Sequence, residues 1–221
     1  MKASDAMKSF AMKQMYSYID KDPDNNIPKL LDLLESSDKN GNSVTDQVKG
    51  IRSAIQDKDS NWYKLVKSLW TDIDDGQRRA LIEAAVINAS LIGTPITIEN
   101  QEKYGCNIPW AILMDPTSAC NLHCTGCWAA EYGYKQNLTF EEMDSIIRQG
   151  KELGTYIYIY SGGEPLVRKN DLIKLCEKHK DCAFLAFTNG TLIDDAFADE
   201  MLRVKNFVPA ISIEGFEEAT D

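Results

Sequence analysis

Residues 110–127 read WAILMDPTSACNLHCTGC, a short apolar segment that runs through an Asp-Pro turn into three closely spaced cysteines. The apolar run at 110–114 is typical of a strand buried on both faces. Similar runs follow at 156–160, 183–187 and 208–213. Amphipathic segments predict helices between the strands. The first helix opens on a capping box at 139–142 and ends at Gly154, and the others span 171–178 and 194–204.

Residues 109–215 therefore alternate strand and helix, which predicts an α/β fold with a parallel sheet and right-handed crossovers. Unusual loops follow all four strands. They contain the cysteines, Gly162-Gly163-Glu164-Pro165, Thr188-Asn189-Gly190 and Glu214-Gly215. The carboxyl ends of parallel strands lie at one edge of the sheet, so we expect these four loops to converge on a common rim.

Residues 1–104 predict a separate helical region, with residues 105–221 forming the α/β domain. Helical spacing of apolar residues marks 5–20, 44–55, 62–70 and 77–92. Ile27-Pro28 is expected to open another helix after a polar break at 22–26. The helix at 77–92 is expected to end at Gly93, because Gly is a common helix terminator and Pro95 follows.

Charge and hydropathy limit the classes of partner. The 221 residues contain 24 Lys and Arg against 34 Asp and Glu, a net charge of −10, of which −8 falls in residues 101–221. Such an acidic domain is a poor match for nucleic acid. The longest uninterrupted apolar run, Cys182–Phe187, is far shorter than the roughly 20 residues of a membrane span. No secretory signal is visible, so we expect a cytoplasmic protein with reduced cysteines.

Cys120, Cys124 and Cys127 form a C-x3-C-x2-C cluster that suggests a metal centre. A structural zinc ion needs four ligands, and the nearest fourth candidates are Cys106 and His123. His123 lies beside Cys124 inside the same loop, where it would be strained. A [4Fe-4S] cube instead accepts three thiolates from one loop and leaves its fourth iron open to a ligand.

The sequence resembles the radical S-adenosylmethionine (radical SAM) superfamily at these residues. Cys120–Cys127 matches the superfamily's C-x3-C-x2-C signature, including the Asn-Leu after the first cysteine, and Gly162–Pro165 matches its GGEP motif. Thr188-Asn189-Gly190 and Ser212-Ile213-Glu214-Gly215 are similar to further landmarks of the family. The resemblance covers residues 109–221.

The resemblance implies that the three cysteines hold a [4Fe-4S] cluster whose open iron binds S-adenosylmethionine (SAM). An electron from a ferredoxin- or flavodoxin-type donor would cleave SAM, and the resulting 5′-deoxyadenosyl radical would take hydrogen from a substrate that the sequence does not identify. The implied cofactor-binding residues are Gly162, Gly163, Glu164, Asn189, Ser212 and Trp128. Two positions depart from the family pattern. Gly126 replaces the usual aromatic, which leaves Trp128 as a stacking surface or a core residue, and Glu214 replaces the usual Asp.

The family core is a partial TIM-type barrel of six β-α units, whereas this sequence shows four. We therefore expect an incomplete barrel that cleaves SAM slowly on its own. A non-catalytic metal-binding module, with iron–sulfur or zinc, is the alternative. Two further expectations concern side chains. Tyr156, Tyr158 and Tyr160 share one strand face, lining the barrel or packing on helices, and His179 in its charged segment is expected to be solvated.

Overall fold

The computed structural model describes residues 3–37, 44–127, 129, 133, 135–213 and 215–216. Trp128 and Glu214 lie outside these residues. The chain forms two compact units, residues 1–78 and 79–221. The second unit thus begins earlier than the predicted α/β domain at residue 105, because the helix before the first strand packs on that unit.

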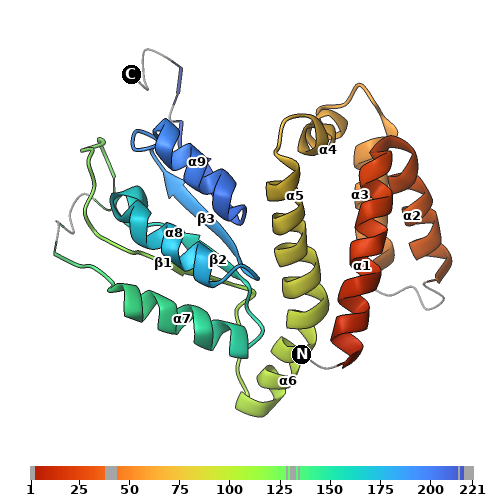
Figure 1. Cartoon of the computed structure of the whole chain (residues 1–221), viewed down its shortest axis with the longest axis horizontal. Coiled ribbons are helices and arrows are strands. Elements are labelled where there is room, and N and C mark those ends of the chain that lie inside the picture. Colours follow the sequence, from red (N-terminus) through yellow and green to blue (C-terminus); the bar gives the residue numbers. More distant parts are fainter. Residues whose placement is uncertain are drawn as a thin grey trace. The chain divides into compact units, whose positions relative to one another are not determined.

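The second unit contains a four-stranded parallel sheet in the order β1-β2-β3-β4 (Figure 1). The strands are β1 (Ala111–Met114), β2 (Ile157–Tyr160), β3 (Ala183–Thr188) and β4 (Phe207–Ile211). Each strand pairs with the next one along the chain. The α/β class and all four predicted strands are confirmed, with shifts of only a few residues at their ends.

Helices connect consecutive strands. They are α7 (Phe140–Glu152), the 3-10 turn η3 (Pro165–Arg168) with α8 (Lys169–Lys178), and α9 (Asp195–Val204). The predicted capping box of α7 is present, since Glu142 N donates to Thr139 Oγ1 and Thr139 N donates to the Glu142 carboxylate. These caps satisfy backbone donors that a helix end otherwise exposes.

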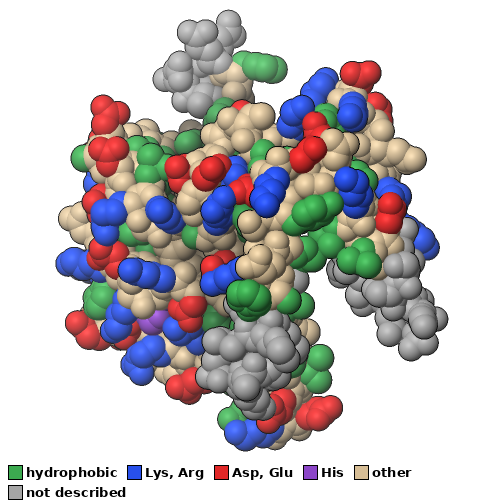
Figure 2. Space-filling model, turned by 45° about the vertical axis from the view of Figure 1, so that its right-hand side comes forward, with side chains coloured by type: hydrophobic (Ala, Val, Ile, Leu, Met, Phe, Trp, Pro, Cys, Tyr) green, Lys and Arg blue, Asp and Glu red, His purple; other side chains and the backbone are tan. Residues whose placement is uncertain are grey.

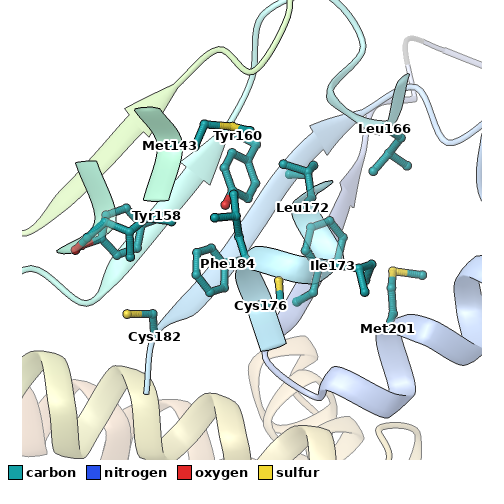
Figure 3. Close-up of a cluster of buried hydrophobic side chains, with 14 of the residues drawn as sticks. Met143, Tyr158, Tyr160, Leu166, Leu172, Ile173, Cys176, Cys182, Phe184 and Met201 are labelled. Carbon is teal, nitrogen blue, oxygen red and sulfur yellow. The ribbon is translucent and has the colours of Figure 1, made fainter. Parts of the chain in front are cut away.

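The core lies between one face of the sheet and helices α7, α8 and α9. Figure 3 shows Tyr158 and Tyr160 of β2 and Phe184 of β3 among helix side chains. The Phe184 ring stacks on Tyr158 at 5.7 Å and on Tyr160 at 5.9 Å between ring centroids. Tyr158 and Tyr160 are fully buried, so they pack on the helices and do not line the barrel. On the opposite face of the sheet, Leu113 and Phe187 remain exposed.

His179 is buried rather than solvated, so the expectation for this residue was wrong. Its Nε2 lies 2.9 Å from Asp144 Oδ1, and Lys178 Nζ lies 2.8 Å from the same oxygen. Burial lowers the pKa of His179 and favours the neutral ring. The sequence pattern failed because His179 follows the last turn of α8, where the chain turns inward to start β3.

The helix before the sheet continues past Gly93, contrary to prediction. It comprises α5 (Asp75–Ile82), the π-helical segment η1 (Glu83–Gly93) and α6 (Thr94–Tyr104), and it ends at Gly105 in the left-handed conformation. Gly93 has helical dihedrals. A Cβ there would lie closer than 3.0 Å to Gly154 O. Gly93 is therefore needed for close approach of two segments, and Pro95 is accommodated in the first turn of α6.

This helix also qualifies as a membrane-span candidate by length and composition. It runs for 30 residues from Asp75 to Tyr104, with a mean hydropathy of 1.6 in its most apolar window. The search for an uninterrupted apolar run missed it, because isolated polar residues interrupt the window. Asn88, Thr97 and Asn100 donate side-chain hydrogen bonds to Asp181 O, Leu153 O and Glu152 O. These contacts attach the helix to the α/β unit, and 17% of its most apolar window is buried.

The first unit consists of α1 (Ala3–Lys21), α2 (Pro23–Ser37), α3 (Val44–Gln56), α4 (Asn61–Thr71) and the start of α5. The predicted helices are confirmed, except that α2 begins at Pro23 and carries Pro28 inside it. Arg78 is buried and links three helices, since it pairs with Asp20 at 2.7 Å and donates to Leu69 O at 3.0 Å. On the face shown in Figure 2, acidic and basic side chains are interspersed.

Asn206 supports the start of β4 from inside the core. It is 1% exposed, and its Nδ2 lies 3.1–3.2 Å from the carbonyl oxygens of Cys176, His179 and Cys182, which share its two hydrogens. Buried carbonyls without a donor cost about 1–3 kcal/mol each. The side-chain amide of Asn206 thus provides hydrogen-bond donors for backbone carbonyls at the end of α8 and in the turn into β3.

We expect Asn206→Ala to lower the free energy of unfolding by about 2–4 kcal/mol, because the carbonyls of Cys176 and Cys182 lose the Asn206 amide, whereas His179 O keeps its bond from Cys182 N. The measurement is urea denaturation followed by circular dichroism. Asn170→Ala is the matched control, since Asn170 is exposed at the start of α8. Equal destabilisation by the two substitutions would contradict the role given to Asn206.

Candidate active site at the carboxyl ends of the strands

The structure brings the predicted loops together at the carboxyl edge of the sheet. Ser161 N donates to Met114 O, so the loop after β2 runs beside the end of β1. Ser212 N donates to Thr188 O at 2.9 Å, so the end of β4 lies beside the end of β3. The parallel register places all these loops on one side, as the sequence predicted.

The cysteine loop leaves β1 and exposes its thiols. Cys124 and Cys127 are exposed and Cys120 is half-buried. Leu122 N donates to Cys120 Sγ at 3.4 Å, which is the kind of backbone contact that offsets charge on a ligating thiolate. Gly126 has a φ of 76°, which a side chain disfavours. A glycine at this position suits the turn better than the aromatic that the family often has.

The remaining cysteines differ from these three. Cys176 and Cys182 are buried in the core, and burial raises the pKa of both thiols. Thiols held neutral in this way are poor metal ligands, because the thiolate is the ligating form. Cys106 is exposed but follows α6, on the amino-terminal side of β1. The loop cysteines are thus the best candidates for ligands.

A single metal ion and an iron–sulfur cluster differ in how closely their protein ligands must converge. Among the residues that the structure describes, no three His, Cys, Asp or Glu side chains converge closely enough to hold one metal ion. A closed tetrahedral zinc site needs such convergence. In a [4Fe-4S] cube each thiolate binds a different iron, so the sulfur atoms stay further apart.

Gly162 and Gly163 hold the loop after β2 tightly against the segment that leads to the cysteines. Gly163 N donates to Thr117 O at 3.0 Å. A Cβ on Gly163 would lie closer than 3.0 Å to Ala119 O, and one on Gly162 would lie equally close to Thr117 O. Gly162 also has a φ of 103°. The glycine pair is therefore required for the backbone contact between two loops.

Glu164 is 1% exposed, and its side chain joins the loops after β2 and β3. Its Oε1 accepts from Leu166 N at 3.0 Å and from Thr188 Oγ1 at 2.7 Å. Its Oε2 accepts from Asn189 N at 2.9 Å. Gly190 N donates to Thr188 Oγ1, which leaves the hydroxyl hydrogen of Thr188 for Glu164. The carboxylate is thus an internal brace between the loops after β2 and β3.

The other predicted cofactor residues lie on the same rim. Asn189 is half-buried, and its side-chain amide is hydrogen-bonded to Asn121 and Thr191. Ser212 is exposed at the end of β4. The contact of these side chains with a cofactor stays a prediction, as does the role of Trp128, which lies outside the described residues.

A cavity of about 550 Å³ opens beside the glycine pair. Asp115, Ser118 and Lys135 line it together with Gly162 and Gly163. The cavity therefore offers a carboxylate and an ammonium group next to backbone that a ligand can approach closely. A second cavity, of about 470 Å³, lies among the helices of the first unit and contains none of the motif residues.

Sequence reasoning missed the residues that brace these loops. Thr117 is 1% exposed, and its Oγ1 donates to Asn137 Oδ1. Arg168 donates to Leu138 O and Pro116 O, which fastens the segments on both sides of the cysteine loop. Thr188 donates its hydroxyl hydrogen to Glu164, a role that its place in the Thr-Asn-Gly motif does not reveal. Polar residues just after strands carry no pattern of their own, so only contacts reveal these roles.

Residues 114–221 match the sequence model of the radical SAM superfamily, and this part of the chain belongs to that superfamily. The matched residues contain the cysteine loop, the glycine pair and Glu164. The structure places these motifs at one edge of a parallel sheet, which agrees with the match.

Characterised relatives share this segment. An Fe-coproporphyrin III synthase from Methanosarcina barkeri is 32% identical over 114 residues, which are 50% of this chain and 28% of the relative. A GTP 3′,8-cyclase from Alkaliphilus metalliredigens is 40% identical over 84 residues, covering 35% of this chain and 26% of the relative. The chain thus spans about a quarter of the length of these relatives.

Solved structures of low overall similarity also match. SuiB from Streptococcus suis, bound to the precursor peptide SuiA, covers 57% of this chain and 29% of its own, with 22% identity and a TM-score of 0.47. The protein anSMEcpe, with bound AdoMet and a Cp18Cys peptide, covers 50% of this chain and 33% of its own, with 26% identity and a TM-score of 0.42.

Gly163→Ala should disturb the cysteine loop, because the new Cβ would clash with the backbone of Ala119. We expect a loss of about 1–3 kcal/mol in the free energy of unfolding and reduced iron uptake during anaerobic reconstitution. The control is Gly50→Ala within α3, where nothing lies within 4 Å of the new Cβ and stability should rise by up to about 1 kcal/mol. Normal stability and iron uptake in Gly163→Ala would refute the packing argument.

Glu164→Gln should lower the free energy of unfolding by about 2–4 kcal/mol, because one oxygen becomes an amide nitrogen that faces a hydrogen-bond donor. Either orientation of the glutamine creates this conflict, since both oxygens accept from donors. The control is Glu141→Gln at an exposed position of α7. Thermal and urea unfolding would measure both, and similar stabilities would show that the brace is unimportant.

Proposed function

We propose that this chain carries the cluster- and SAM-binding part of a radical SAM enzyme, with Cys120, Cys124 and Cys127 as ligands of a [4Fe-4S] cluster. One observation carries the proposal. Gly163 N donates to Thr117 O and Glu164 N donates to Ala119 O, so backbone hydrogen bonds join the GGEP segment to the residues directly before Cys120 at the carboxyl edge of the sheet. A ligand bound at the open position of such a cluster would lie beside the glycine pair.

The cluster, when bound, would supply the electron that cleaves SAM to methionine and a 5′-deoxyadenosyl radical. The residues of the chain have other tasks. Gly162 and Gly163 let the backbone come close to the cofactor. The three donors to Glu164 are neutral, so its buried carboxylate leaves a negative charge that favours a nearby cation such as the ammonium of SAM. Asn189 and Ser212 are proposed to contact the ribose or carboxylate of SAM.

The proposal includes two further partners and a location. A low-potential ferredoxin or flavodoxin would supply the electron, and a substrate would supply the hydrogen atom. We propose that the substrate lies on the face of the sheet that carries exposed Leu113 and Phe187, because this face offers an apolar surface beside the rim. We place the protein in the cytoplasm, where thiolate ligands remain reduced.

The relatives support the cofactor chemistry, but they do not point to a single common substrate. Their names state different products, an iron coproporphyrin, heme and a cyclised GTP. Each of them matches about half of this chain or less. The substrate of this protein is therefore a separate question from the binding of the cluster.

The cysteine assignment is tested by iron content after anaerobic reconstitution. We expect about four iron atoms per chain in the wild type, and a loss of most of this iron in Cys120→Ala, Cys124→Ala and Cys127→Ala. Cys106→Ala is the control, because this exposed cysteine lies outside the loop. The assignment is wrong if Cys106→Ala empties the site as fully as Cys124→Ala does, or if the bound metal is zinc.

Catalysis is tested by release of 5′-deoxyadenosine from SAM under a strong reductant. Release of 5′-deoxyadenosine that is lost in Cys124→Ala supports the proposal that the chain is catalytically active. A chain that binds four irons but releases no 5′-deoxyadenosine would instead be a non-catalytic iron–sulfur module. Chromatographic separation with mass detection distinguishes these outcomes.

A further inference from the structure

Three polar side chains at the rim form a closed ring of hydrogen bonds. Asn121 Nδ2 donates to Thr191 Oγ1 at 2.7 Å, and Thr191 Oγ1 donates to Asn189 Oδ1 at 2.6 Å. Asn189 Nδ2 donates to Asn121 Oδ1 at 3.0 Å and closes the ring. Each side chain thus gives one hydrogen bond and accepts one within the ring, in which Asn121 and Thr191 are exposed and Asn189 is half-buried.

The backbone fixes the orientation of this ring. Thr191 N donates to Asn189 Oδ1 at 3.0 Å, which identifies that atom as the oxygen of the amide. The amide nitrogen of Asn189 must then face Asn121, and the nitrogen of Asn121 must face Thr191. The direction of all three bonds follows from this one contact.

The ring joins two loops that the sheet alone would not hold together. Asn121 follows Cys120 in the cysteine loop, whereas Asn189 and Thr191 belong to the loop after β3. Asn189 N also donates to the Glu164 carboxylate. A continuous path of hydrogen bonds therefore runs from the GGEP segment through the loop after β3 to the cysteine loop.

We infer that Asn121 and Thr191 are positioning residues, which hold the cysteine loop at a fixed place relative to Glu164 through the ring with Asn189. The inference goes beyond the proposed function and rests on it for the identity of the bound cluster. The ring is formed by side chains of the protein alone, so it sets the loop before a cluster binds. The cysteine loop would then lose less conformational entropy when its three cysteines bind the cluster.

The first test is hydrogen exchange of the metal-free protein, measured by mass spectrometry. Asn121→Ala and Thr191→Val should each raise the exchange rate of amides in both 120–127 and 188–193, by about fivefold if one net hydrogen bond is lost. Thr191→Val keeps the backbone bond from Thr191 N, so it removes only the ring. Thr191→Ser restores the hydroxyl and should restore slow exchange.

A double-mutant cycle separates the ring from independent local effects. Because either substitution opens the same ring, the double variant should exchange no faster than the single variants. Asn100→Ala is the control, since this amide makes two hydrogen bonds to backbone carbonyls away from the rim. It should leave exchange in both loops unchanged.

The second test is the release of cluster iron to a chelator after anaerobic reconstitution. Asn121→Ala and Thr191→Val should release iron several-fold faster than the wild type and Thr191→Ser. Unchanged exchange in both loops, additive effects in the double variant, or equal iron release would each overturn the inference. A wild-type chain that takes up no iron would count against the proposed cluster instead, and the exchange measurement would still decide the role of the ring.

Discussion

The arrangement of the rim depends on the hydrogen bonds that the buried carboxylate of Glu164 accepts. The carboxylate accepts from the backbone of η3, from the hydroxyl of Thr188 and from the backbone of Asn189. The loops after β2 and β3 are thereby held together at the edge of the sheet. Without such donors, burial of the carboxylate would carry a large desolvation free energy. The donors in the two loops offset this free energy, so the loops and the carboxylate stabilise each other.

The parallel sheet makes this brace possible. Register between β2 and β3 brings Tyr160 beside Ala186, so the segments that follow start at the same level. Gly162 and Gly163 then allow the loop after β2 to contact the segment before the cysteines. The chemistry at the rim thus follows from a backbone geometry that the core under α7, α8 and α9 maintains.

Much of this could be predicted from the sequence. The alternation of apolar strands with capped helices gave the sheet, and motifs after each strand gave the rim, because both are local patterns with a clear period. The failures have a common cause. Gly93 and His179 were interpreted from their neighbours along the chain, whereas close approach to Gly154 and contact with Asp144 decide their roles. The network of Asn121, Asn189 and Thr191 also depends on contacts between distant segments.

We propose that the cysteine loop and the GGEP loop form one cofactor site. The most direct test is electron–nuclear double resonance on the reduced, reconstituted protein, with SAM that carries ¹⁵N at its methionyl amine. The account predicts a ¹⁵N coupling to the cluster, because the open iron and the glycine pair would bind the same end of SAM. A four-iron cluster that shows no ¹⁵N coupling at saturating SAM would contradict it.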